Sequence, residues 1–135
     1  MKLGGMSFFQ LASQRMTWLG ARQAVISENV ANADTPDYKA KKVSGFDAML
    51  ENADAMQGLK VTDTRHITSS GETPNGVRVT ADEDAWEGSI DGNTVALEQQ
   101  TIDAAEVAGS YRLAAELYRR GHSLLTIAVT GVRYE

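Results

Sequence analysis

Two long stretches of this chain, one near each end, repeat mostly apolar residues at alternating spacings of three and four. Such a heptad repeat lines one side of an α-helix for contact with another helix, as in coiled coils. The sequence therefore predicts a mainly α protein whose long N- and C-terminal helices pair as a coiled-coil-like bundle. The first repeat comprises Phe9, Ala12, Met16, Leu19, Gln23, Ile26, Val30 and Ala33, and the second Ala104, Val107, Tyr111, Ala114, Tyr118, Gly121, Leu125, Ala128 and Val132.

The expected helix ends follow from local signals. Ser7 is a suitable N-cap for a first helix that runs to about residue 33. That helix must end near Asp34, because Pro36 lacks an amide hydrogen and keeps Thr35 out of the α region. The second helix is expected from about residue 95 to about residue 131. The turn at 91–94 is expected to lead into its cap.

The middle of the chain has a different pattern. Residues 43–60 are weakly helical, whereas 59–67 and 75–82 show short β-like alternation with a turn signal at 74–76. We predict that 43–92 form an acidic insert that is flexible or lightly β-structured. Residues 1–42 and 93–135 are expected to form one α-helical assembly domain.

The second helix is apolar over a wider arc than one partner helix can cover. Leu117 and Leu124 lie on one flank of its repeat, and Leu113 lies further round. Another copy, another protein or an internally folded bundle would have to cover the remainder. The helix-packing interface is predicted to comprise Phe9, Met16, Leu19, Ile26, Val30, Val107, Tyr111, Tyr118, Leu125 and Ala128.

Composition excludes several classes of function. The chain has no cysteine, so it cannot use a thiol nucleophile, a cysteine-bound metal or a disulfide. Its net charge is −5, and residues 43–94 hold ten acidic but only three basic side chains. No basic face is concentrated enough to suggest a nucleic acid partner. We expect neither a transmembrane segment nor a cleaved signal peptide.

Candidate catalytic residues are few. His66 and His122 are the only histidines, and they are far apart in sequence. The acidic run 82–84 lacks the spacing of a calcium-binding loop, so a solvated loop is the expected reading. No phosphate-binding loop or nucleophile elbow is present. We therefore predict no enzyme activity, cofactor, metal or small-molecule ligand.

The end of the first helix carries the most specific motif, in the sequence NVANADTPDYKA at residues 29–40. It resembles the N-terminal signature of the bacterial flagellar rod and hook family, Asn-x-x-Asn-x-x-Thr-Pro-Gly-Tyr-Lys. The matching residues, which form the candidate assembly motif, are Asn29, Asn32, Thr35, Pro36, Tyr38 and Lys39. Asp37 stands where the family usually has glycine. Because aspartate tolerates left-handed backbone geometry, we expect the turn to be kept.

The resemblance extends to the C-terminal helix, at residues 91–98, 111–112 and 122–125, and to Arg65-His66-Ile67 in the middle. Together with the short chain, it implies a structural subunit of the proximal rod in the basal body, assembling through its terminal helices. The implied partners are other rod proteins, the ring–rod adaptor, the MS-ring protein and the flagellar type III export apparatus. The implied location is the periplasmic rod, reached without a cleaved signal peptide.

The motif also has a physical interpretation. Asn29 flanks the helix-packing seam, where a buried polar group can set the register between helices. Asn32 and Asp34 can bond the backbone groups left unpaired where the helix stops. A different class of function stays open from the residues alone, namely a small soluble helical adaptor or regulator that acts as a monomer or dimer.

Overall fold

The computed structural model describes residues 7–56, 76–86 and 88–131. Its elements are α1 (Phe8–Ala31), β1 (Lys41–Val43), α2 (Phe46–Met56), β2 (Val79–Ala81) and α3 (Leu97–Thr130). The predicted mainly α fold with two long terminal helices is confirmed, and the middle is lightly β-structured. The sequence patterns at 59–67 and 74–75, which include Arg65-His66-Ile67, lie outside the described residues.

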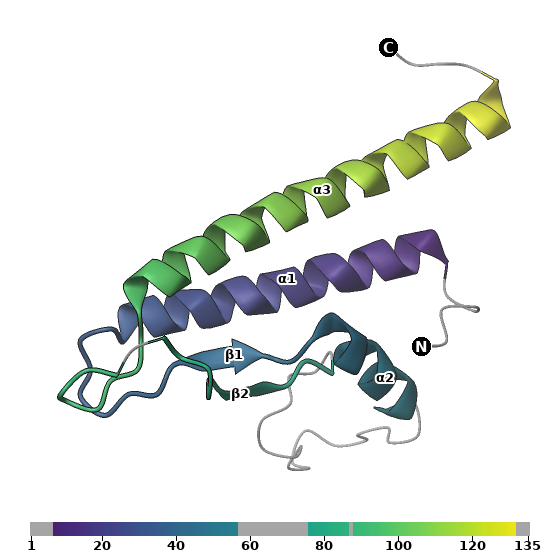
Figure 1. Cartoon of the computed structure of the whole chain (residues 1–135). Coiled ribbons are helices and arrows are strands. Elements are labelled where there is room, and N and C mark those ends of the chain that lie inside the picture. The colour runs from purple at the N-terminus through teal and green to yellow at the C-terminus, as the bar shows by residue number, and fades with distance from the viewer. Residues whose placement is uncertain (1–6, 57–75, 87, 132–135) are drawn as a thin grey trace.

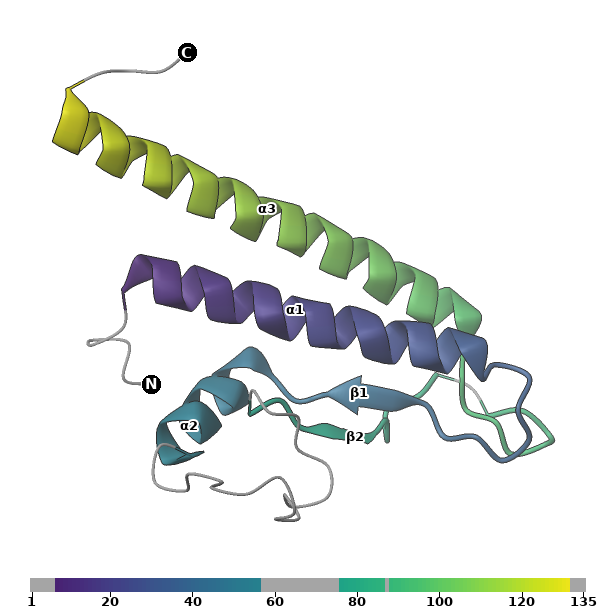
Figure 2. The same cartoon turned by 180° about the vertical axis from the view of Figure 1, so that it is seen from behind.

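The elements form three layers (Figure 1). Helix α1 lies in the middle, with α3 running back along one side of it. The β1–β2 pair and α2 lie on the other side, as the view from behind also shows (Figure 2). Helix α1 therefore has two covered sides.

The N-terminus of α1 is fixed by a capping box. The Ser7 hydroxyl accepts a hydrogen bond from the Gln10 amide at 3.2 Å, and the Gln10 side chain accepts one from the Ser7 amide at 3.0 Å. The prediction of Ser7 as N-cap is confirmed. The helix ends at Ala31, two residues before the predicted end, because Asn32 already has non-helical backbone angles and caps the last turn.

The predicted turn at 91–94 precedes α3, and the helix begins without a side-chain cap. The N-cap residue is Ala96, which has no side chain capable of capping. Asn93 instead bonds the Val95 amide just before the helix, at 2.8 Å. The other end of α3 follows the sequence signal, since Gly131 caps it in the left-handed conformation at φ 67°.

The strand pair is antiparallel, and Lys42 lies opposite Thr80 in its register. β2 falls inside the predicted β-like segment 75–82. β1 was not predicted, because three residues are too few to show an alternating pattern. The pair connects the chain just after α1 to the segment just before α3.

The core draws on all three layers. Its buried cluster consists of Trp18, Leu19, Ile26, Met49, Val77 and Val107. Met49 and Val77 belong to the segment that the sequence assigns to an insert, and they pack with residues of α1 and α3. The functional division at residues 42 and 93 stays a prediction.

The two long helices separate toward the N-terminus of α1 (Figure 1). α3 has 34 residues and α1 has 24. With a rise of about 1.5 Å per residue, α3 is therefore about 15 Å longer. A Cβ on Gly121 would meet the rings of Phe8 and Phe9, so α3 passes the start of α1 near Gly121. Beyond it, Leu124 and Val129 are 67% and 85% exposed.

In the described part of the chain, no helix is both long and apolar enough to cross a membrane.

Candidate functional site

The motif at the end of α1 meets the segment that precedes α3 at the closed end of the helix pair. We call the resulting hydrogen-bonded group the polar clasp. Asn29 and Asn93 are its two central residues, and both are buried. Its other side-chain members are Asn32, Thr35, Tyr38, Lys39, Thr94 and Gln100.

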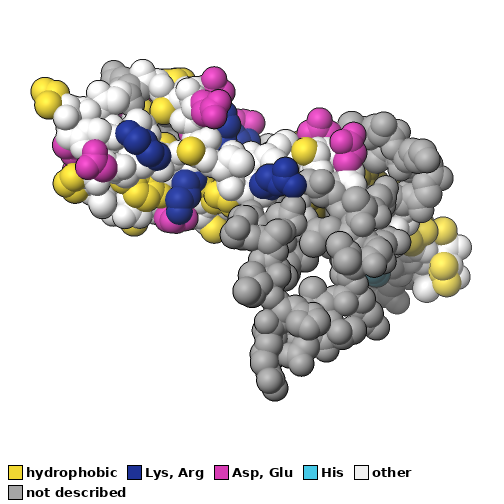
Figure 3. Space-filling view, turned by 90° about the horizontal axis from the view of Figure 1, so that it is seen from below, with side chains coloured by type: hydrophobic (Ala, Val, Ile, Leu, Met, Phe, Trp, Pro, Cys, Tyr) yellow, Lys and Arg dark blue, Asp and Glu magenta, His cyan; other side chains and the backbone are white. Residues whose placement is uncertain are grey.

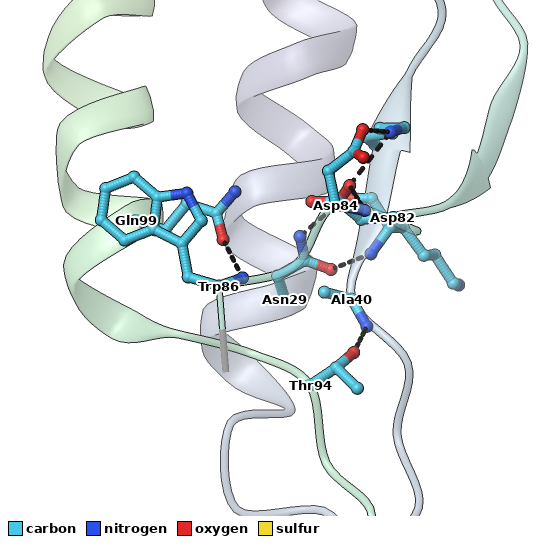
Figure 4. Close-up of polar contacts among 9 residues, drawn as sticks. Asn29, Ala40, Asp82, Asp84, Trp86, Thr94 and Gln99 are labelled. Atoms are coloured by element: carbon cyan, nitrogen blue, oxygen red, sulfur yellow. Dashed lines mark hydrogen bonds and ion pairs between the residues drawn. The ribbon is translucent and has the colours of Figure 1, made fainter. Parts of the chain in front are cut away.

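Asn29 joins three parts of the chain. Its side-chain nitrogen donates to the Lys41 carbonyl at 2.8 Å and to the Gln100 side chain at 3.0 Å. Its oxygen accepts from the Lys41 amide at 2.9 Å and from the Tyr38 hydroxyl at 3.3 Å. Figure 4 shows the Asn29 side chain near the end of α1, beside β1. One buried amide thus fixes α1, β1 and α3 relative to one another.

Asn93 performs the same task for the loops. Its side-chain nitrogen donates to the carbonyls of Asn32 and Thr35 at 2.9 and 2.8 Å. Both carbonyls lie in the turn that follows α1. The side-chain oxygen of Asn93 accepts from Val95 at the entrance to α3. A single side chain therefore joins the exit of one helix to the approach to the other.

Further bonds hold the two loops along their length. The Asp37 amide donates to the Asp91 carbonyl at 2.9 Å, and the Thr94 amide to the Tyr38 carbonyl at 3.0 Å. The Lys39 ammonium donates to the Gly92 carbonyl at 2.6 Å, and the Thr94 hydroxyl accepts from the Ala40 amide at 2.9 Å (Figure 4). The clasp is therefore continuous from residue 37 to residue 40.

Asn32 and Thr35 close the turn itself. The Asn32 side-chain nitrogen donates to the Glu28 carbonyl at 2.8 Å, and this carbonyl also accepts from the Asn32 backbone amide at 3.1 Å. The Thr35 hydroxyl donates to the Asn32 side-chain oxygen at 3.2 Å. Asn32 thus bonds the backbone at the end of α1 as expected, but the carbonyl it meets already has a backbone partner. Pro36 is exposed next to this turn.

Asp37 adopts the left-handed backbone conformation, with φ 59°. It is the only non-glycine residue with positive φ among those described. Its carboxylate lies over Gly92, where any Cβ would come within 2.4 Å of it, and Gly92 has φ 83°. The turn expected from the sequence is kept, and two left-handed residues face each other in it.

Two ionisable side chains at the edge of the clasp, Tyr38 and Asp91, have shifted pKa values. Partial burial, followed by the nearby carboxylate of Glu28, raises the pKa of the Tyr38 hydroxyl. The backbone amide of Asn93 and the side chain of Ser89 form hydrogen bonds with the Asp91 carboxylate and lower its pKa. Tyr38 therefore stays protonated and Asp91 stays ionised near neutral pH.

The predicted interface residues fall into two groups. Leu19, Ile26 and Val107 are buried between α1 and α3, and Met16 is half-buried. The ring centroids of Phe9 and Tyr118 are 5.3 Å apart, and the His122 ring lies edge-on to Phe9 and tilted beside Tyr118. The remaining residues, Val30, Tyr111, Leu125 and Ala128, are exposed. The described fold therefore buries only part of the set.

Sequence reasoning missed Gln100 and Asn93 as site residues. Gln100 lies seven residues before Val107, so it continues the second heptad seam as a polar residue. That position was a usable signal. Asn93 was seen only as part of a turn, because its two carbonyl partners lie about 60 residues away in sequence.

The polar clasp is suited to a structural role, which is to hold the loop after α1 against the segment before α3. Its central groups are neutral amides, hydroxyls and backbone atoms that bond one another. Among the described residues, no group of three or more potential ligands could hold a metal ion. His66 lies outside these residues. On the described part of the face in Figure 3, basic and acidic side chains are interspersed.

Comparison with known proteins points to one family. A family model described as "Flagella basal body rod protein" matches residues 9–39, which span most of α1 and most of the motif. A protein of Agrobacterium fabrum named "Flagellar basal body rod protein FlgB" is 32% identical, over 90% of this chain and 91% of the relative.

Two relatives with the same printed name come from other bacteria. The Bacillus subtilis protein is 30% identical, over 82% of this chain and 83% of its own length. The Escherichia coli K12 protein is 29% identical, over 68% of this chain and 70% of its own length. The similarity thus extends well beyond the short motif.

Proposed function

This chain belongs to the family of flagellar basal body rod proteins, and from this premise we propose that it is a structural subunit of the rod. The observation that carries the proposal is the match to proteins of that name over up to 90% of the chain. The physical features agree with it. The motif builds a rigid clasp, and α3 extends beyond its cover with exposed apolar side chains.

The subunit acts through protein–protein contacts. It associates with other components of the basal body, and its terminal helices supply the contact surfaces. We place it in the proximal rod, next to other rod proteins, the ring–rod adaptor and the MS-ring protein. The residues that carry assembly are the motif residues of the clasp and the exposed part of the predicted interface, including Tyr111, Leu125 and Ala128.

The proposal includes a route and a location. The flagellar type III export apparatus delivers the chain to the periplasmic rod without cleavage of a signal peptide. The intact mass of the subunit recovered from purified basal bodies tests this, because cleavage would shorten it. No cofactor, catalysis or nucleic acid takes part.

A complementation experiment tests the function. A strain that lacks this chain should be non-motile and should lack rods, and the unaltered gene should restore both. The variant Leu125→Asp should fold, since this side chain is 53% exposed, yet it should fail to enter the rod because the charge would be buried there. Motility without the chain would overturn the proposal. No contact in the described part of the chain favours the soluble adaptor.

A further inference from the structure

Three large apolar side chains are exposed in the segment that leads into α3. Trp86 is 62% exposed, Ile90 is fully exposed, and Leu97, the first residue of α3, is 50% exposed. None of the aromatic or cation contacts between described residues involves the Trp86 ring. The fold therefore gains little from these side chains. Tryptophan is among the residues most enriched at the energetic centre of protein interfaces.

The backbone that carries Trp86 and Ile90 is held in place. The Trp86 amide donates to the side chain of Gln99 at 3.4 Å, in the first turn of α3 (Figure 4). The Ser89 amide donates to the carbonyl of Asn93 at 2.7 Å, which closes the turn around Ile90 and joins it to the polar clasp. A surface held in this way loses little conformational freedom when a partner binds.

The same segment is strongly acidic. Residues 82–98 contain six acidic and no basic side chains. Lys42, from outside the segment, forms ion pairs with Asp82 and Asp84. Within the described part of the chain, three exposed carboxylates form no ion pair, namely those of Glu83, Asp91 and Glu98. We call these three residues, together with Trp86, Ile90 and Leu97, the acidic apolar surface.

The charge of this surface selects the class of partner. Its carboxylates would be repelled by the phosphates of nucleic acids and by anionic lipid headgroups. A second copy of the chain also has a net charge of −5, so two copies repel each other on average. A different protein with lysine or arginine side chains around an apolar pocket is complementary, because its cations can pair with the free carboxylates while the pocket accepts the indole.

We propose that the acidic apolar surface binds a different protein of the basal body, at a basic surface that contains an apolar pocket. Trp86 enters the pocket, Ile90 and Leu97 extend the apolar contact, and Glu83 and Glu98 pair with cations at the rim. The apolar side chains supply most of the affinity, whereas the rim charges direct encounter and specificity. The inference rests on the proposed function, and it specifies one contact surface and the chemistry of its partner.

Photo-cross-linking in cells tests the partner. The full chain carries the photoreactive amino acid p-benzoylphenylalanine at position 86, which keeps an aromatic ring there, and it replaces the unaltered chain in the strain. Irradiation should join it to a basal-body protein other than itself. Mass spectrometry should place the cross-linked site on a basic surface of that protein. A product with only a second copy, a product with lipid or glycan, or no product would overturn the proposal.

Charge reversal tests the carboxylates on the same photoreactive chain. Glu83→Lys should lower the yield of the mixed product at least about fivefold, because like charges then face each other. Glu51→Lys is the matched control, since it makes the same charge change at an exposed position on α2, outside the acidic apolar surface. It should leave the yield unchanged. Equal effects of the two variants, or no loss with Glu83→Lys, would overturn the proposal.

Removal of the apolar side chains separates binding from folding. The double variant Trp86→Ala with Ile90→Ala should keep the urea unfolding curve of the purified chain, because both side chains are exposed. Its amount in purified basal bodies should fall at least about fivefold, whereas Trp86→Phe, which keeps a ring, should cause a smaller loss.

Two results with the double variant would overturn the surface. A destabilised purified chain would show that the side chains serve the fold, and an unchanged amount in basal bodies would show that they bind nothing there. The rod function would stand in both cases. Full motility in a strain lacking the chain would instead refute the rod function itself.

Discussion

The side-chain amides of Asn29 and Gln100 meet at 3.0 Å between α1 and α3, and they are only 1% and 3% exposed. A neutral buried pair of this kind holds only when both helices are in one register, since a slip of one turn moves the partners apart by about 5.4 Å. The other bonds of Asn29, to Lys41 and Tyr38, tie the same point to the chain that leaves α1. The family motif thus sets the geometry of the helix pair.

Replacement of Asn29 by alanine should destabilise the fold. It leaves the Lys41 backbone and the Gln100 side chain without partners in a buried place, at about 1–3 kcal/mol for each such group. We expect the free energy of unfolding to fall by about 2–4 kcal/mol in urea titrations. Gln23→Ala is the matched control, an exposed amide on the same helix, and should change it by less than about 0.5 kcal/mol. Equal effects of the two changes would contradict the role of Asn29.

Sequence reasoning succeeded where the signal was local or periodic. The heptad repeats predict α1 and α3, because spacing alone selects one helix face, and Ser7 and Pro36 mark the ends of α1. It failed where a partner lies far away in the chain. Gln100 and Asn93 acquire their roles only from contacts 58 to 71 residues away. Strand β1 depends likewise on β2, and its three residues carry no pattern of their own.

The predicted interface also shows what sequence periodicity alone cannot predict. Leu19 and Leu125 belong to matching heptad seams, yet one is 1% exposed and the other 53%. Periodicity identifies the side of a helix that is suited to contact. It does not tell how far the partner helix extends, which depends here on α1 starting at Phe8, opposite Gly121.

The two tryptophans should respond differently to the same change. The Trp18 indole nitrogen donates to the Ser44 carbonyl at 2.8 Å, and the ring is 7% exposed, whereas Trp86 is 62% exposed. Trp18→Phe should lower the free energy of unfolding by about 1–3 kcal/mol through the unpaired carbonyl and lost contacts. Trp86→Phe should change it by less than about 0.5 kcal/mol. The reverse order in urea titrations would show that Trp18 does not anchor the middle segment to α1.

Substitutions at Asp37, which has a left-handed backbone conformation, should give an ordered series of stabilities. Glycine adopts a φ of 59° without steric strain, aspartate does so at moderate cost, and a β-branched residue is strained there. Asp37→Gly should stay within about 1 kcal/mol of the unaltered chain, and Asp37→Val should be less stable by about 1–2 kcal/mol. Thermal unfolding of the three proteins gives the order. A valine variant as stable as the glycine variant would show that the turn has another geometry.

Acid should weaken the clasp through Asp91. A hydrogen bond from the Asn93 backbone amide, and a smaller effect of the Ser89 side chain, favour the charged form of Asp91. Its pKa in the folded state therefore lies below the ordinary 3.8. Its contribution to stability is therefore present above pH 3.8 and is lost as the pH falls through the lower folded pKa.

The variant Asp91→Asn isolates this effect. Asp84 and Glu116 also have lowered pKa values, from bonds to Lys42 and to Arg120 and Arg119 respectively, and both remain in the variant. Unfolding measured from about pH 5 to about pH 2 should show a shallower loss of stability for the variant than for the unaltered chain. Parallel curves for the two proteins would mean that Asp91 does not contribute.

Amide hydrogen exchange on the isolated chain should show a gradient along α3. Protection should be strong from about Gln100 to about Gly121, where α1 lies against the helix and the clasp holds one end. It should fall over residues 123–130, because exposed side chains such as Leu124 and Val129 leave that end with few packing contacts. In the assembled rod, the same residues should become protected as neighbouring subunits cover them. Asn29→Ala should reduce protection at the clasp end without changing residues 123–130. Strong and uniform protection up to Thr130 in the monomer would contradict the gradient, and it would count against a subunit that completes its packing only on assembly.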